Sequence, residues 1–286
     1  MSEHLKNFIS VTRLNKPVGF MLLFWPCSWG LSLAFFFERD IELFFYYLFL
    51  FFCGSVLMRS AGCILNDIVD EKIDKKVLRT RNRPIASGKL NKTLAWLYVI
   101  FLCFLAFLIL LQFNLFTIYL GMFSMLFAFT YPFMKRFTYW PQLFLGFTFN
   151  WGIIMAWASL SNDISYLALI LYFGAIFWTL GYDTIYGVQD ISDDEVIGVK
   201  STAIKFKKNI GLFVGSCYSI SILAIFFVLM NLNVKYSLII FLGFILTLFY
   251  QIKICKNKDS SLCLKAFKLN NLSGMLVFSN FLLINF

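Results

Sequence analysis

The chain has 286 residues, of which 60% are hydrophobic and 20% aromatic, whereas only 14% are charged. Soluble domains are about 45–50% apolar and about 25% charged, so this composition excludes an ordinary soluble protein and indicates an integral membrane protein. The net charge of +10 at pH 7 does not indicate nucleic-acid binding, because the basic residues lie in short loops between apolar runs. Seven cysteines without a C-x-x-C pair and a single histidine, His4, indicate neither a disulfide framework nor a zinc site.

Apolar runs of about 20 residues, long enough to cross a bilayer as helices, recur along the whole chain. They are continuous rather than alternating, which excludes a membrane β-barrel. We predict an all-α, polytopic membrane protein with about nine transmembrane helices around a central cavity that opens to the cytoplasmic side. The chain is expected to form one domain with two related halves, roughly 1–138 and 139–286. The predicted spans are residues 17–37, 43–65, 93–112, 115–134, 141–161, 165–187, 209–231, 235–252 and 268–286.

The distribution of basic residues predicts the orientation in the membrane. With a cytoplasmic N-terminus, 22 of the 25 Lys and Arg residues fall in cytoplasmic segments, as the positive-inside rule requires. Arg39 and Lys235 fall outside, and Arg59 lies within a span. The two long loops, 66–92 and 188–208, are cytoplasmic in this layout, so we expect the functional site on that face.

A stripe of polar residues continues from the second predicted span. Asn66, Asp70 and Asp74 are four residues apart, so a continuing helix places them on one face, and Cys63 and Arg59 extend that face backwards. Arg59 lies about 10 Å deeper than Asn66 along the helix, which is costly unless it faces a polar cavity. Carboxylates with an amide suit Mg²⁺ that also contacts a substrate phosphate. The alternative is a solvated helix end, which leaves like charges destabilising one another without a counter-ion.

A second acidic stripe ends the sixth predicted span. Asp183, Tyr186, Asp190 and Asp194 step by three, four and four residues, which again places them on one helical face. Asp183, Asp190 and Asp194 are separated by seven and four residues, as Arg59, Asn66 and Asp70 are in the first stripe. This repetition suggests that two duplicated halves face one cavity. Two Mg²⁺ ions held by such carboxylates would bind a diphosphate and neutralise it as it leaves. The basic residues that could contact its phosphate oxygens are Arg79, Arg81, Arg83, Lys135, Arg136 and Lys200.

These residues resemble the motifs of a known family, the UbiA superfamily of intramembrane prenyltransferases. The second acidic motif is similar to that of the 4-hydroxybenzoate polyprenyltransferase branch, and the matches are spread over essentially the whole chain. Glu71 departs from some bacterial members, which have a basic residue there. The matching segments are Arg13-Leu14-x-Lys16-Pro17-x-Gly19, Asn66-Asp67-x-x-Asp70-x-x-x-Asp74, Arg79-Thr80-x-x-Arg83-Pro84, Tyr131-Pro132-x-x-Lys135-Arg136 and Tyr182-Asp183-Thr184-x-Tyr186-x-x-x-Asp190-x-x-Asp193-Asp194.

The resemblance implies a reaction. It is the Mg²⁺-assisted transfer of a polyprenyl group from polyprenyl diphosphate to the ring carbon ortho to the hydroxyl of 4-hydroxybenzoate, in ubiquinone biosynthesis. The implied partners are these two substrates and the lipid bilayer, with no nucleic acid. We expect a bacterial inner membrane rather than a mitochondrial one. The oligomeric state is not predicted.

The resemblance and the spacing together assign roles to individual residues. Arg136 is the expected anchor for the benzoate carboxylate and Arg59 the alternative, because a guanidinium binds a carboxylate through two hydrogen bonds. Asp183 and Tyr186 are expected beside the aromatic substrate. Four aspartates are also expected to act in catalysis: Asp70, Asp74, Asp190 and Asp194. The expected metal ligands are Asn66, Asp70, Asp74, Asp190 and Asp194, and the expected diphosphate-binding residues are Lys16, Arg79, Arg83, Tyr131, Lys135 and Lys200.

Two other functions compete with this interpretation. Intramembrane Arg59 and Asp183 in related halves would also suit a membrane transporter. However, the acids cluster at one face instead of the midplane, and helices broken by Gly or Pro are not evident in corresponding halves. A prenyltransferase of the same superfamily with a different acceptor is the nearer alternative.

Overall fold

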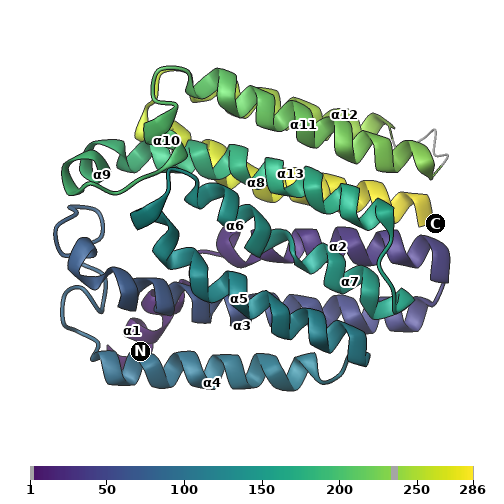
Figure 1. The fold of residues 1–286 in the computed structure, drawn as a ribbon, viewed down its shortest axis with the longest axis horizontal. Helices are drawn as coiled ribbons and strands as arrows, with labels where there is room; N and C mark the ends of the chain where they lie inside the picture. Colours follow the sequence, from purple (N-terminus) through teal and green to yellow (C-terminus); the bar gives the residue numbers. More distant parts are fainter. Residues whose placement is uncertain (1–2, 233–237, 286) are drawn as a thin grey trace.

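The computed structural model describes residues 3–232 and 238–285, and this part of the chain is helical with no β-strand (Figure 1). The helices run mostly side by side along the long axis of the molecule. The helices are α1 (Glu3–Thr12), α2 (Val18–Glu38), α3 (Ile41–Asp74), α4 (Lys92–Leu110), α5 (Leu115–Phe137), α6 (Pro141–Asn150), α7 (Gly152–Ser161), α8 (Tyr166–Gly187), the 3₁₀ helix η1 (Val188–Asp190), α9 (Ile191–Ile197), α10 (Thr202–Lys205), α11 (Ile210–Asn231), α12 (Leu238–Ile254) and α13 (Ser260–Asn285).

The predicted class, an all-α polytopic membrane protein, is confirmed. Among the described residues, eight segments are long and apolar enough to cross a bilayer, with α6 and α7 together forming one of them. The shorter α12 has 17 described residues and corresponds to the remaining predicted span, 235–252. Residues 235–237 of that span lie outside the described residues.

Helix α3 is longer than the span predicted from its apolar run, 43–65. The Asp40 side chain accepts a hydrogen bond from the Leu43 N–H at 3.0 Å and so begins the helix. The helix then continues for 34 residues to Asp74. This corresponds to about 50 Å, more than the apolar layer of about 30 Å. The helix is therefore long enough for Asn66, Asp70 and Asp74 at its end to extend beyond that layer.

The second acidic stripe is shared among three consecutive helices, α8, η1 and α9. Helix α8 ends at Gly187, η1 tightens the chain through Asp190, and α9 carries Asp194 to a left-handed Gly198 with φ 80°. Glycine takes this left-handed conformation without the strain that a Cβ atom causes, and it therefore commonly ends a helix. The predicted common face is kept across the joint, because Asp183, Asp190 and Asp194 line the same cavity.

Helices α2 and α7 approach each other backbone to backbone. A Cβ atom at Gly30 would lie 2.4 Å from the Ile153 carbonyl oxygen, and one at Gly152 would lie 2.3 Å from Cys27 Sγ. The predicted single span 141–161 is interrupted at Trp151, between α6 and α7. Glycine on both helices therefore allows α2 to pass through the centre of the bundle.

Buried polar groups join the helices of the C-terminal half. Asn270 on α13 accepts a hydrogen bond from Trp178 Nε1 on α8 at 2.9 Å and donates one to Gln251 on α12 at 3.0 Å. Tyr218 on α11 donates to the same Gln251 oxygen at 2.6 Å. Each of these polar groups is satisfied inside the protein, as burial requires.

Helix α13 begins earlier than predicted. The span was expected from residue 268, but Asp259 accepts a hydrogen bond from the Leu262 N–H at 2.9 Å and the helix starts at Ser260. Lys265 and Lys268 are consequently helical rather than part of a loop. This extra length brings Lys268 to the central cavity.

Candidate active site

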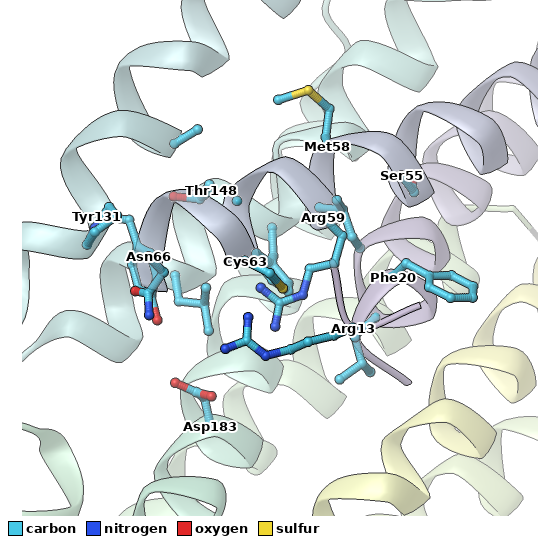
Figure 2. A pocket seen from close by; sticks show the side chains of 18 of the residues that line it. Arg13, Phe20, Ser55, Met58, Arg59, Cys63, Asn66, Tyr131, Thr148 and Asp183 are labelled. Atoms are coloured by element: carbon cyan, nitrogen blue, oxygen red, sulfur yellow. The ribbon is translucent and has the colours of Figure 1, made fainter. Parts of the chain in front are cut away.

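A cavity of about 1300 Å³ lies among the helices from α2 to α8. Its deeper wall is apolar, and its mouth is lined by the two acidic stripes and by basic side chains from the loops. Figure 2 shows Arg13, Arg59 and Asn66 extending into this space, with Asp183 reaching it from the opposite side. The apolar wall includes Leu22, Leu50, Phe51, Phe107, Met125, Leu145, Phe149 and Met155.

Asp70, on the first stripe, is the most enclosed of the acids predicted as metal ligands. Its side chain is only 1% exposed and forms an ion pair with Lys135 of α5 through Oδ2. The other oxygen, Oδ1, is buried without a hydrogen-bond partner, and Arg136 Nη2 lies 3.9 Å away. A buried carboxylate oxygen without a hydrogen-bond donor is costly, so Asp70 has spare capacity to bind a cation.

Two further acids of the same helix share a single arginine. Arg83 Nη1 lies 2.8 Å from Asp74 Oδ2 and 3.0 Å from Asp67 Oδ1. Arg13 Nη2 also donates to Asp67 Oδ1, at 2.6 Å. Burial disfavours the charge of Arg13, but Cys63 and Asp67 raise its pKa overall. Asp67 therefore joins α1, α3 and the 75–91 loop.

The second stripe is held by Arg79. Its Nε and Nη2 donate to the two oxygens of Asp190, at 2.8 and 2.7 Å. The guanidinium also lies over the Tyr186 ring, 5.9 Å from its centroid. Such a two-point contact fixes the plane of both groups. Arg79 belongs to the loop that follows the first stripe, so it connects the two halves at the cavity mouth.

The mouth carries a concentration of positive charge. Lys16, Lys135, Lys200 and Lys268 line it from four different elements. Burial lowers the pKa of Lys16, and the positive charges of its neighbours lower it further. The neighbours responsible are Arg13, Arg79, Arg83 and Lys268. A bound polyanion would relieve this repulsion.

Arg59 lies deeper in the cavity than the acids. Its guanidinium lies over the Phe149 ring, 5.3 Å from the centroid, and its Nε is buried without a hydrogen-bond partner. Gly19 makes room for it, because a Cβ there would lie 3.0 Å from Arg59 Nε. Asp183 and Tyr131 line the same region. A buried guanidinium with unused hydrogen-bonding capacity is suited to binding a carboxylate.

Fourteen of the fifteen predicted site residues line this cavity, and Arg136 does not. Its Nη2 donates to the Val69 carbonyl at 2.9 Å, and its guanidinium lies over Phe133. The residues that line the cavity are Lys16, Arg59, Asn66, Asp70, Asp74, Arg79, Arg83, Tyr131, Lys135, Asp183, Tyr186, Asp190, Asp194 and Lys200.

Sequence reasoning assigned no role to Arg13 or Lys268, although both line the cavity. Arg13 lies inside a matching motif, and its positive φ of 56° turns the chain just after α1. Lys268 belongs to no motif. The available signal was a charged residue beside a long apolar run, which was interpreted as a loop lysine.

The oxygen groups on the two stripes fit a hard cation such as Mg²⁺ by their chemistry. Asn66 and the unpartnered Oδ1 of Asp70 offer free oxygen atoms on one wall, and Asp194 lies on the other. Among the described residues, no three acidic, His or Cys side chains are close enough together to hold a metal ion. Asp70, Asp74 and Asp190 are instead each paired with a basic side chain. These carboxylate oxygens fit Mg²⁺ when an anionic ligand replaces them as the partner of the basic side chains.

Fold and site together define a class: a helical membrane protein with an apolar cavity whose mouth combines acidic and basic side chains. Such a site suits an amphiphile with a polyanionic head. A model described as the UbiA prenyltransferase family matches residues 23–272, and the chain belongs to that family. The resemblance found in the motifs is thereby confirmed.

Two relatives illustrate the similarity. The chain is 38% identical over 286 residues to the 4-hydroxybenzoate octaprenyltransferase of Nitrosomonas eutropha, and the match covers 99% of this chain and 98% of that protein. It is 44% identical over 214 residues to the mitochondrial 4-hydroxybenzoate polyprenyltransferase of Arabidopsis thaliana. That match covers 74% of this chain and 52% of the plant protein.

Two solved structures share the fold. The apo structure of a UbiA homolog from Aeropyrum pernix has a TM-score of 0.78 at 20% identity and covers 92% of this chain and 97% of that one. A UbiA homolog from Archaeoglobus fulgidus bound to GPP and Mg²⁺ has a TM-score of 0.71 at 14% identity. The match covers 97% of this chain and 99% of that one.

Proposed function

We propose that this protein transfers a polyprenyl group from polyprenyl diphosphate to the ring carbon ortho to the hydroxyl of 4-hydroxybenzoate, a step of ubiquinone biosynthesis. The observation that carries the proposal is a single cavity with an apolar wall and a mouth lined by both acidic stripes and a group of bases. The names of the relatives support 4-hydroxybenzoate as the acceptor. The second acidic motif, which resembles that of the same branch, supports it as well.

The basic residues at the mouth bind the diphosphate. In the structure, ion pairs with acids of the stripes hold Arg79, Arg83 and Lys135. When the diphosphate binds, each of these bases can donate its hydrogen bonds to phosphate oxygens instead. Lys16 and Lys200 have no acid partner among the described residues and meet the head directly. Tyr131, from α5, is positioned to donate its hydroxyl.

Asn66, Asp70, Asp74, Asp190 and Asp194 would hold Mg²⁺, in our proposal as two ions. When bound, the metal neutralises charge on the departing diphosphate. The Archaeoglobus fulgidus homolog bound to GPP and Mg²⁺ supports this assignment at the level of the fold. The acids also keep the bases at the mouth oriented before substrate arrives, through the ion pairs described above.

The apolar wall receives the prenyl tail and excludes water. Phe51, Phe107 and Phe149 line it together with aliphatic side chains. An allylic cation reacts with any nucleophile within reach, so excluding water protects it until the aromatic ring attacks. The transfer then joins the prenyl carbon to the ring, and the ring carbon loses its proton.

Arg59 is the better candidate to bind the benzoate carboxylate. It lines the cavity and has a buried Nε without a partner, whereas Arg136 contacts the Val69 carbonyl and does not line the cavity. We therefore assign the anchor to Arg59, the alternative in the sequence interpretation. Asp183 and Tyr186 face the same space and would orient the aromatic ring.

The proposed location is a bacterial inner membrane, with the N-terminus and the cavity mouth on the cytoplasmic side. The positive-inside distribution of Lys and Arg supports this orientation. Cysteine accessibility at the mouth-side loops and at the opposite loops would test it. Labelling of the mouth-side loops from outside intact cells would contradict the orientation.

The reaction is tested in membranes that contain this protein, labelled 4-hydroxybenzoate, a polyprenyl diphosphate and Mg²⁺. The expected product is 3-polyprenyl-4-hydroxybenzoate, absent with Asp70→Asn. Diphosphate release that requires a different acceptor would support prenyl transfer as the reaction but reject 4-hydroxybenzoate as the acceptor. A complete absence of both product and diphosphate release, with correctly inserted protein, would reject the proposed reaction.

A further inference from the structure

A second, smaller cavity of about 330 Å³ lies away from the catalytic one, between α11 and α12 at the end of the bundle that carries the acidic stripes. Ile185 of α8 forms part of its floor, while the next residue, Tyr186, lines the catalytic cavity. The two cavities therefore lie on different sides of α8. We call the smaller one the lysine groove. It is lined by Ile185, Lys208, Ile210, Gly211, Val214, Ile252, Lys253, Cys255, Lys256 and Lys258.

The rim of the lysine groove is strongly positive. Lys208, Lys253 and Lys256 are exposed and have no acidic partner in the part of the chain that the structure describes. Lys258 has a left-handed φ of 56°, and its Nζ donates to the Lys207 carbonyl at 2.8 Å, which ties the two loops together. Four ammonium groups around one opening repel one another, so an anion there would stabilise the arrangement.

Nearby acids do not neutralise this charge. Glu195 forms an ion pair with Lys207 at 2.8 Å, outside the groove. Asp259 accepts hydrogen bonds from Ser261 and Leu262 at the start of α13, and those bonds hold its pKa below the usual range. No acidic side chain lines the groove among the described residues.

The floor of the groove is apolar and open along the helices. A Cβ at Gly211 would meet nothing within 4 Å, and one at Gly215, a turn further along α11, would meet only Ile252 Cδ1 at 4.0 Å. Val214 and Ile252, which line the groove, are apolar. The space between α11 and α12 therefore continues from the lysines into the apolar layer.

We infer that the lysine groove binds an anionic phospholipid, with its phosphate among Lys208, Lys253 and Lys256 and an acyl chain along the glycine side of α11. Basic pockets between transmembrane helices are suited to acidic headgroups. A free phosphate or a soluble phosphorylated metabolite would use the lysines but not the apolar floor. The combination of both surfaces favours a lipid.

The test uses the full-length protein purified in a neutral detergent and titrated with phosphatidylglycerol, with phosphatidylcholine as the reference lipid. Bound lipid is counted by native mass spectrometry, and the midpoint of thermal unfolding is followed in parallel. Wild type is expected to bind phosphatidylglycerol saturably and to be stabilised by it. Replacing Lys208, Lys253 and Lys256 by Gln is expected to weaken this binding about tenfold or more.

A matched variant replaces three other exposed lysines of the same end of the bundle, Lys6, Lys76 and Lys89, by Gln. It loses the same charge and is expected to bind phosphatidylglycerol as wild type does. An equal loss of phosphatidylglycerol binding in both variants would show a general attraction of the positive surface for the lipid. It would overturn the proposed binding site in the groove. Failure of wild type to prefer phosphatidylglycerol over phosphatidylcholine would also overturn it.

Gly211→Leu separates charge from shape. It keeps every lysine and places a large apolar side chain at the floor, where a Cβ meets no atom within 4 Å. Weaker phosphatidylglycerol binding with unchanged folding is expected. Unchanged binding in this variant, or displacement of the lipid by millimolar inorganic phosphate, would assign the lysines to a free anion and overturn the lipid site.

Discussion

At the scale of single residues, the site is organised by ion pairs between the two acidic stripes and bases from elsewhere in the chain. Asp70 pairs with Lys135 of α5, and Asp190 pairs with Arg79 of the 75–91 loop. Breaking one member of a buried pair leaves the other uncompensated, which is strongly unfavourable. The acids of this site are therefore expected to tolerate an isosteric amide better than truncation.

Asp70→Asn is expected to lower the rate of prenyl transfer by more than about 100-fold. Loss of a residue that only supports a metal ligand costs roughly 10–100-fold, and loss of a ligand itself should cost more. The shape of the side chain is kept, so the protein is expected to insert and unfold normally. Turnover in membranes, together with the thermal unfolding midpoint, checks both statements. Lys75→Gln, a change on the exposed side of α3's end, is the control. Near-normal turnover of the Asn variant would remove Asp70 from the metal site.

Arg59→Ala is expected to raise the KM for 4-hydroxybenzoate about 10–100-fold, the cost of losing a charge-assisted hydrogen bond. The KM for the prenyl diphosphate should change far less, because Arg59 lies deeper than the mouth. Arg136→Ala removes a guanidinium that does not line the cavity and should leave the ratio of the two KM values unchanged. The opposite pattern would return the anchor to Arg136.

At the scale of elements, the close approach of α2 and α7 determines how the cavity is walled. Leu22 and Cys27 of α2 and Met155 of α7 all line it, and the contact depends on glycine at two positions. Nothing in the apolar pattern of either helix identifies those glycines as contact points. Only the crossing of the helices makes them necessary.

Gly30→Ala places a methyl group 2.4 Å from the Ile153 carbonyl oxygen, closer than atoms can lie, so the helices must separate. We expect a loss of about 1–3 kcal/mol of stability, as for other overpacked interiors. Gly243→Ala on α12 is the matched control, since its Cβ would make an ordinary contact at 3.7 Å with Leu276. Thermal unfolding in detergent compares the two. Equal midpoints would contradict the close contact between α2 and α7.

At the scale of the whole molecule, the central cavity is lined by residues from both halves of the chain. The first stripe comes from α3, the second from α8 to α9, and Lys268 comes from α13. One hydrophobic core includes residues from Leu22 to Phe281 and so joins the two halves. The duplication of the halves stays a prediction.

Removal of divalent cations is expected to abolish prenyl transfer, because in our proposal the acidic stripes would bind the diphosphate only through Mg²⁺. Activity should be lost when EDTA is added to the membranes, and excess Mg²⁺ added afterwards should restore it. Spermidine in place of Mg²⁺ is the control for general charge screening. Activity that resists EDTA, or that spermidine restores fully, would contradict the metal model.

Properties that depend on one helix at a time were readable from the sequence. Apolar run length determined the spans, and a spacing of four residues put Asn66, Asp70 and Asp74 on one face, because helical geometry is the same everywhere. The motifs identified the family correctly. Boundaries were less reliable: α3 and α13 extend beyond their apolar runs, since polar helix ends carry no hydropathy signal.

Contacts between distant segments were decided only by the tertiary structure. The sequence favoured Arg136 over Arg59 as the carboxylate anchor, whereas packing places Arg59 in the cavity and Arg136 against the Val69 carbonyl. The same holds for Lys268 and for the lysine groove. Which side chains meet depends on how helices cross, and that depends on small residues such as Gly30, whose role appears only when two backbones touch.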